Sequence, residues 1–273
     1  MDQHVTYHPI TDELLQSYRY YISGDDGARV AAEHCGAMGM DEALTTRFLD
    51  LLPHFAKPDA YPFDQTHGFS IALTQGFFGP YFYINGGQLS GLGDVIAPYV
   101  RPWQQSLPDW DMAATAQNTV LSQFSSGVFI SADQVASFMS DAHTVPELSQ
   151  ALATHFPGNA LGVLWSALQY AHDAGSGLLE AAGALEPNLA DPTLSTCYTR
   201  LDHCDPSSLQ VYAAGQQTAP PVSPEPELPV PPHLADRVSV NAGERLPSTP
   251  SLTERLRAKR GDAPMPDTTA EEQ

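Results

Sequence analysis

Groups that could perform chemistry gather in one short segment, residues 197–205. The segment contains two thiols, an imidazole and two carboxylates, which belong to Cys197, Asp202, His203, Cys204 and Asp205. These groups are the ligands that zinc prefers in proteins. Structural zinc sites usually place paired cysteines two to four residues apart, whereas six residues separate the two cysteines here.

A metal site in this segment needs a further ligand from a distant part of the chain, and His172 and Cys35 are the candidates. The candidate ligands are therefore His172, Cys197, His203 and Cys204. The alternative is a turn with a buried cysteine, followed by a helix that starts at Asp205 and Pro206. No motif in the sequence requires a cofactor.

Two cysteines follow histidines directly, Cys35 after His34 and Cys204 after His203. A nucleophilic thiolate needs an imidazole that points at it, and adjacent residues of a helix or strand point in different directions. The sequence also lacks the Gly-x-Ser-x-Gly nucleophile elbow and the Gly-x4-Gly-Lys-Ser/Thr phosphate loop. We therefore favour a binding protein over an enzyme. An enzyme with a metal or thiol site near residues 197–204 is the alternative.

Aromatic and acidic residues gather between residues 81 and 111 in a pattern that suits a protein interface. Aromatic anchors dominate the energy of such interfaces, and neighbouring carboxylates attract a basic partner. The candidate partner-binding residues are Tyr81, Tyr83, Trp103, Asp109, Trp110 and Asp111. The alternative is that these aromatic side chains belong to the hydrophobic core.

The chain is strongly acidic. Its 273 residues include 12 Lys and Arg against 32 Asp and Glu, a net charge of −20. Proteins that hold DNA or RNA do so through lysine and arginine contacts to phosphates, so this charge excludes a nucleic-acid partner. Residues 1–217 carry most of the charge, with 6 basic and 23 acidic residues. A structured acidic surface suits a basic protein partner.

The sequence indicates a cytoplasmic protein without a membrane partner. Its start lacks the basic and then apolar order of a secretory signal. The longest apolar stretch, near residues 159–171, falls short of the ~20 residues that a spanning helix needs. Three cysteines are too few for a disulfide scaffold, which favours a reducing compartment.

The composition changes at about residue 217. All 25 aromatic residues lie before that point, whereas 11 of the 24 prolines lie after it. We predict one globular domain over residues 1–217, and a sub-boundary near residue 120 is the alternative division. Residues 218–273 are predicted to be a disordered, proline-rich acidic tail with a short helix over 251–260. An adaptor that works through this tail is a further alternative function.

Local patterns predict the elements that position these residues. In the first half, Thr11 and Asp41 can each cap a helix. The expected elements there are helices at residues 11–22, 28–38 and 41–53, strands at 69–73 and 81–84, and an ordered loop at 97–118.

In the second half, Ser131 with Gln134 and Thr144 with Glu147 match the capping-box spacing. The expected elements are a strand at residues 127–130, two helices after these boxes, a helix at 160–174 and a strand at 178–182. The whole pattern predicts an α+β fold with helices packed on a small, mostly antiparallel sheet.

The second half also resembles an uncharacterised bacterial domain family, over roughly residues 125–212. The likeness rests on the segments Leu168-Gln169-Tyr170-Ala171, Gly177-Leu178-Leu179-Glu180-Ala181, Glu186-Pro187-Asn188 and Cys204-Asp205-Pro206. The resemblance implies no catalytic residues. Domains of this kind are similar to small bacterial proteins that neutralise toxins, which implies an immunity-type function. We therefore expect a bacterial cytoplasmic protein that binds another protein, in its sharpest form one that neutralises a basic toxin.

Overall fold

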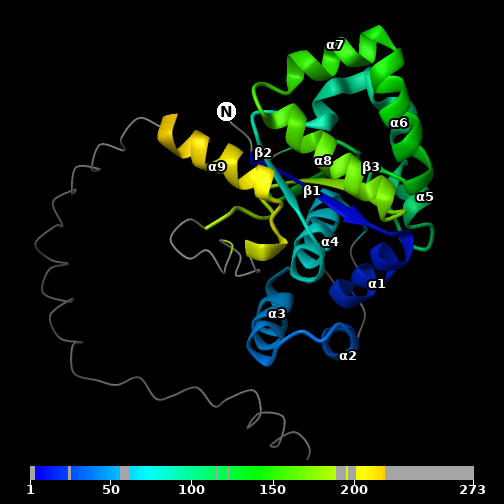
Figure 1. Cartoon of the computed structure of the whole chain (residues 1–273). Coiled ribbons are helices and arrows are strands. Elements are labelled where there is room, and N and C mark those ends of the chain that lie inside the picture. Colours follow the sequence, from blue (N-terminus) through cyan, green and yellow to red (C-terminus); the bar gives the residue numbers. More distant parts are fainter. Residues whose placement is uncertain are drawn as a thin grey trace, which may run out of the picture. The chain divides into compact units, whose positions relative to one another are not determined.

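The computed structural model describes residues 4–23, 26–55, 62–114, 116–121, 123–188, 195 and 201–218 (Figure 1). The chain divides into two units at Pro220, and the described residues belong to the first unit. The predicted tail, including its helix over 251–260, lies outside the described residues beyond Thr218. Cys197 also lies outside them.

The centre of the fold is a four-stranded antiparallel sheet, which confirms the predicted α+β class. Its strands are β1 (His4–Ile10), β2 (Phe82–Asn85), β3 (Ser125–Ile130) and β4 (Gly177–Ala182). The strand order is β2-β1-β4-β3, so the two strands of the first half of the chain and the two of the second half join in one sheet through the pairing of β1 with β4. In the register, Tyr7 of β1 lies opposite Phe82 on one side and Glu180 on the other.

Four helices from the first half of the chain form one layer. They are α1 (Asp12–Ser23), α2 (Gly27–Ala37), α3 (Glu42–Phe55) and α4 (Gln65–Phe78). Helix α4 packs directly on the sheet, and α1 packs against α4 (Figure 1). The core of this side contains Phe48 and Phe77 from the helices and Leu179 from the sheet. We call it the α1–α4 layer.

Three helices from the second half cover the opposite face of the sheet. They are α6 (Ala132–Thr144), α7 (Pro146–His155) and α8 (Ala160–Asp173), which we call the α6–α8 layer. Successive side chains of a strand point to opposite faces, so Leu178 joins the core of this layer while Leu179 joins the other. Helix α8 contacts β1, β2 and β4, and its last turn carries the exposed Tyr170.

Shorter elements close the edges of the sheet. They are η1 (Leu89–Val95), η2 (Ala97–Tyr99), α5 (Trp103–Ser106), η3 (Leu201–His203) and α9 (Pro206–Thr218). Helix α9 covers the edge strand β2, where the Tyr83 amide donates to Ser208 Oγ at 2.8 Å. The Tyr81 amide donates to the His203 carbonyl at 2.8 Å. These bonds protect an edge that would otherwise expose unpaired backbone groups.

The strand predicted at residues 69–73 is wrong, because these residues lie inside α4. A side-chain cap starts this helix: the Asp64 carboxylate accepts from the Thr66 amide at 2.9 Å, and the Asp64 amide donates to His67 Nδ1 at 3.1 Å. The helix is buried on nearly all sides, so its apolar run has no helical period and looks like a buried strand. The sequence patterns also gave no prediction for β1.

The other helices and strands lie within a few residues of their predicted positions, but the caps differ. Thr11 and Asp41 do cap their helices, through the amides of residues 14 and 44. The two predicted capping boxes are wrong. Ser131 instead donates to Asp133 Oδ1, and Thr144 is the last residue of α6. Pro53 lies within α3 rather than at its end.

Candidate functional site

The structure separates the predicted metal ligands. His172 lies at the end of α8, in the α6–α8 layer, whereas His203 and Cys204 contact the α1–α4 side of the sheet. His203 Nδ1 lies 3.1 Å from the Gly76 carbonyl oxygen and so makes a backbone contact. Within the described ranges, no three His, Cys, Asp or Glu side chains come close enough to hold a metal ion. The predicted ligands therefore form no metal cluster among the described residues, and a site that includes Cys197 stays a prediction.

The two described cysteines do not have the environment of a nucleophile. Burial raises the pKa of the Cys204 thiol to about 12. Burial also raises the pKa of the Cys35 thiol, while the neighbouring His34 hydrogen-bonds with the Tyr21 hydroxyl instead. A catalytic thiol needs the opposite shift, because the thiolate is the reactive form. Both thiols are therefore protonated side chains of the hydrophobic core.

The predicted aromatic interface needs a correction. The side chains of Tyr81, Tyr83, Trp103 and Trp110 are all buried in the core, and only Asp109 and Asp111 are exposed. Their ring contacts explain the burial: Trp103 lies 4.8 Å from Phe63, and the Arg19 guanidinium lies over Trp110 at 5.0 Å. Tyr81, Trp103 and Trp110 belong to the α1–α4 core, and Tyr83 packs against Tyr212 of α9, so these rings do not form the surface that the sequence suggested.

A buried carboxylate in the middle of the sheet was not among the predicted site residues. Glu180 Oε1 accepts from the Tyr7 hydroxyl at 2.9 Å and from the Leu89 amide at 2.5 Å. Its Oε2 accepts from the amides of Ser90 at 3.1 Å and Val128 at 3.2 Å. Burial raises the pKa of Glu180, while these hydrogen bonds oppose the rise.

The backbone around Glu180 is shaped to receive the carboxylate. Strand β3 contains a register shift between Ser126 and Phe129, and two residues there stand opposite Glu180 alone. One of them is Gly127, where an added Cβ would lie 2.0 Å from Glu180 Oε2. The carboxylate therefore fastens η1 and the β3 bulge to the sheet. We interpret Glu180 as a structural group, because it is fully buried and its partners are backbone amides and the side chains of Tyr7 and Ser90.

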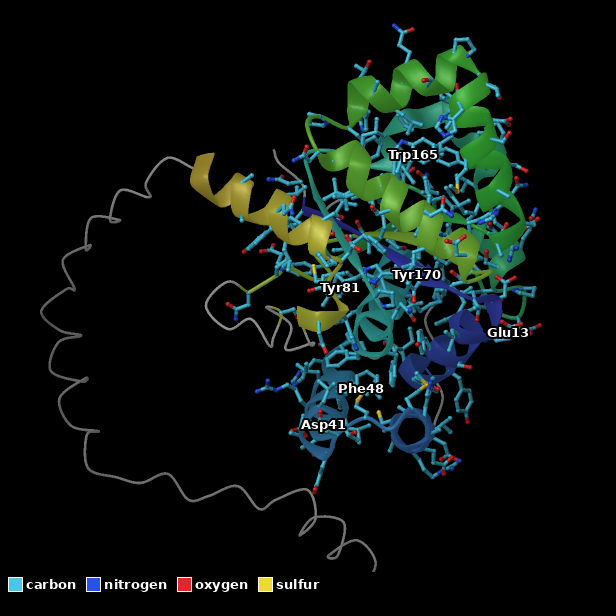
Figure 2. The ribbon with its side chains drawn as sticks, in the orientation of Figure 1. Glu13, Asp41, Phe48, Tyr81, Trp165 and Tyr170 are labelled. Atoms are coloured by element: carbon cyan, nitrogen blue, oxygen red, sulfur yellow. The ribbon has the colours of Figure 1, made fainter. Side chains whose placement is uncertain are left out.

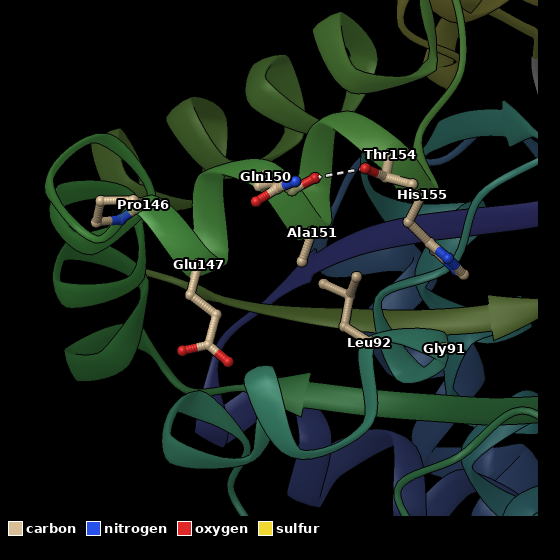
Figure 3. Close-up of a pocket in the computed structure, with 8 residues that line it drawn as sticks. All are labelled: Gly91, Leu92, Pro146, Glu147, Gln150, Ala151, Thr154 and His155. Carbon is tan, nitrogen blue, oxygen red and sulfur yellow. Dashed lines mark hydrogen bonds between the residues drawn. The ribbon is translucent and has the colours of Figure 1, made fainter.

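Two open grooves lie on the α6–α8 side. The first runs between η1 and α7, where Leu92 points toward Ala151 (Figure 3). Its other lining residues are Gly91, Pro146, Glu147, Gln150, Thr154 and His155. Its wall contains no aromatic side chain except His155, which packs tightly against Gly91. This groove offers few anchors for a ligand.

The second groove lies between α6 and α8, and we call it the α6/α8 groove. It is lined by Met139, His143, Trp165, Ser166, Gln169, Tyr170 and Asp173. The His143 and Trp165 rings stack with centroids 4.8 Å apart and an angle of 8° between their planes. Figure 2 places Trp165 and Tyr170 along α8, whereas Phe48 lies in the α1–α4 layer. The cavity volumes of the two grooves, about 570 Å³ here and 640 Å³ in the first, do not distinguish them. The two grooves differ in their side chains, since Trp165 and Tyr170 line only the α6/α8 groove.

The described part of the chain is acidic as a whole, and one carboxylate, that of Asp173, lines the α6/α8 groove. The described residues include 19 acidic and 4 basic side chains. The basic groups are engaged within the chain: Arg29 pairs with neighbouring carboxylates, Arg101 pairs with Asp12, Arg19 stacks on a ring, and Arg47 also has a partner. At the groove itself, the Asp173 side chain is 65% exposed. The negative charge is therefore available to a partner.

Comparisons with family models, with curated proteins and with solved structures give no match. Among the described helices, none has the length and apolar character needed to cross a membrane.

Sequence reasoning missed the groove residues for identifiable reasons. Trp165 follows Leu161 and Leu164 at helical spacing, and such spacing is typical of the buried side of a helix. The structure places it at the edge of that side, half-buried. Tyr170 lies five residues further along, on the opposite border of the exposed face. Glu180 had a clear signal, because a lone carboxylate in an otherwise apolar strand must find buried donors.

Proposed function

We propose that this protein acts by binding a basic protein partner through the α6/α8 groove. The observation that carries the proposal is that two large aromatic side chains, Trp165 and Tyr170, border an accessible groove in a strongly acidic domain. In its sharpest form, the proposal is an immunity-type protein that covers the active site of a basic toxin in the bacterial cytoplasm. The resemblance over residues 125–212 supports this form as an analogy.

In this proposal, aromatic side chains and carboxylates contribute differently to binding. Tryptophan and tyrosine supply most of the binding energy at protein interfaces, because they bury large areas with little loss of side-chain entropy. Carboxylates around them steer a basic partner and repel an acidic one. Tyr170 is 45% exposed and lines the groove, so much of its side chain is accessible to a partner.

The test begins with the full chain as bait in a lysate of the organism that encodes it. Bound proteins are eluted in salt steps and identified by mass spectrometry. The affinity of a purified candidate is then measured by calorimetry for the unaltered chain and for Tyr170→Ser and Trp165→Ala. We expect each variant to weaken binding at least tenfold, since interface aromatics are frequent hot spots.

The matched control is Tyr20→Ser, because Tyr20 is also 45% exposed but lies on α1, in the other helix layer. This control should change affinity less than twofold. A partner that binds both groove variants as tightly as the unaltered chain would overturn the proposal. So would a partner whose affinity does not fall with added salt, since the acidic surface would then play no part.

The exposed carboxylates of the earlier candidate surface provide an independent comparison. Asp109→Lys with Asp111→Lys reverses charge beside the buried Trp110. If the partner sits on the α6/α8 groove, this double variant should reduce the association rate modestly and flatten its salt dependence. A loss of affinity larger than that of Tyr170→Ser would move the interface to the α1–α4 side.

A further inference from the structure

We propose that the α6/α8 groove binds an arginine side chain of the partner, with Tyr170 and Asp173 as its two contacts. This inference rests on the proposed function and specifies the chemistry of the partner. The two residues stand three apart in the last turn of α8, so their side chains are neighbours on the helix surface. An aromatic ring beside a carboxylate is a suitable arrangement for a guanidinium group.

The tyrosine ring is held in place. The Tyr170 and Phe82 ring centroids lie 6.0 Å apart, with an angle of 57° between the planes. Helix α8 thus rests this ring on the sheet and leaves 45% of the side chain exposed. A ring that is already positioned costs little entropy when a cation stacks on it.

The carboxylate is also oriented. Asp173 Oδ1 accepts from Gln169 Nε2 at 2.8 Å and contacts His172 Nδ1 at 3.1 Å. These hydrogen bonds lower the pKa of Asp173, so the group is ionised at neutral pH. Among the hydrogen bonds of the described residues, none reaches Oδ2, which is therefore available to a partner's donor. The site is also at the C-terminal end of α8, where the helix dipole favours a positive charge.

The same chemistry occurs inside this chain. The Arg101 guanidinium lies over the Phe129 ring at 5.6 Å and donates to Asp12 at 2.8 Å. A second carboxylate, that of Asp133, accepts from it at 3.2 Å. Arg101 shows how this fold holds a guanidinium between a ring and carboxylates. At Tyr170 and Asp173 the ring and the carboxylate are present, and the described residues place no arginine between them.

Arginine suits this arrangement better than lysine. The planar guanidinium can stack on a ring and donate two parallel hydrogen bonds to a carboxylate, whereas the ammonium group of lysine is a compact and strongly hydrated charge. The stacked His143 and Trp165 rings at the α6 side of the groove offer an apolar surface next to it. The partner would therefore present an arginine with an apolar neighbour.

The test uses N-acetyl-arginine-N-methylamide and its lysine counterpart as probes, titrated into the full ¹⁵N-labelled chain. We expect the arginine probe to shift the backbone amide signals of residues 169–174 and to bind at least fivefold more tightly than the lysine probe. Asp173→Asn should abolish the preference for arginine. The control Asp50→Asn removes an exposed carboxylate from α3 and should leave both titrations unchanged.

Equal affinity for the two probes, or a preference for arginine that persists in Asp173→Asn, would overturn the inference. Asp173→Glu provides a second variant that keeps the charge, and it should retain part of the arginine preference. If neither probe binds but Tyr170→Ser still weakens binding of the partner, the arginine site is wrong and the proposed function is retained. Retention of the partner by both groove variants would remove the proposed function itself.

Discussion

The two helix layers of this protein differ in where their large aromatic side chains lie. In the α1–α4 layer, Phe48, Phe77 and Trp103 are fully buried in one core. In the α6–α8 layer, Phe138 and Phe156 are also buried in the core, whereas Trp165 and Tyr170 line the α6/α8 groove at the surface. Buried rings therefore stabilise the fold in both layers, and the two rings along the groove are accessible to a partner. The predictions below test that contrast.

The largest expected effect concerns the buried tryptophan. Trp103→Ala should lower the free energy of unfolding by about 3–5 kcal/mol, because it removes a large side chain from a close-packed core. Trp165→Ala, from the rim of the groove, should lower it by only about 1 kcal/mol. Chemical denaturation of both variants checks this pair. Equal losses would mean that Trp165 is a core residue and that the contrast between the layers is false.

A second prediction concerns the centre of the sheet between the layers. Glu180→Ala removes the acceptor of the amides of Leu89, Ser90 and Val128. We expect a loss of about 3 kcal/mol, since buried donors without partners are costly. Hydrogen exchange should rise first at η1, which the carboxylate fastens to the sheet. A variant as stable as the unaltered chain would contradict the structural role of Glu180.

The two sides of the sheet also hold titratable groups with opposite pH effects. Burial lowers the pKa of His8 from 6.5 to about 3, so folding requires the neutral ring. The free energy of unfolding is therefore not reduced by His8 above pH 6.5, and it decreases as the pH drops toward 3, because the unfolded chain then binds a proton that the folded chain does not. Relative to His8→Phe, the unaltered chain should lose about 2 kcal/mol between pH 7 and pH 5. Denaturation midpoints at several pH values measure this difference.

Glu180 acts in the other direction. Its pKa in the folded state lies above the unfolded value of 4.5, so folding takes up a proton in the window between the two. Its contribution therefore becomes less favourable as the pH rises through that window. In Glu180→Ala, this part of the pH dependence should vanish while the His8 part remains. A pH profile unchanged by the substitution would show that the folded-state pKa of Glu180 is not raised.

The smallest expected effect concerns Phe124, an exposed aromatic residue outside the groove whose backbone conformation is strained. Phe124 is 60% exposed at the start of β3, and its φ of 63° is in the left-handed region that bulky residues rarely adopt. Phe124→Gly should stabilise the chain by about 0.5 kcal/mol, because glycine adopts this conformation without strain. Leu121→Gly is the control, since Leu121 is similarly exposed. It should be neutral or destabilising, and a stabilisation of both would remove the strain argument.

Most elements of the fold could be predicted from local patterns. Thr11 and Asp41 cap helices because a short polar side chain precedes an amphipathic run, and both signals are local. The α4 helix could not be recognised, because a helix buried on all sides loses the periodic pattern that identifies it. Strand β1 was missed for a related reason, since six of its seven residues are buried and they include histidine and threonine.

The site was less predictable than the fold. The charge indicated an acidic protein that suits a basic partner, but the local pattern picked Trp103 and Trp110 as surface aromatics, and both are buried, whereas Trp165 and Tyr170 line the groove. Whether a ring is core or surface depends on which elements pack over it. That depends on contacts such as Trp103 with Phe63, between residues 40 positions apart.

The sequence by itself determined the charge, most helix starts and the strands β2, β3 and β4, because each of these depends on residue type or on neighbours within a few positions. Only the tertiary structure decided that β3 and β4 join β1 and β2 in one sheet. It also decided that His172 and His203 lie on different sides and that Glu180 meets its donors from three distant segments. These outcomes depend on long-range packing and on burial, which have no local signature in the chain.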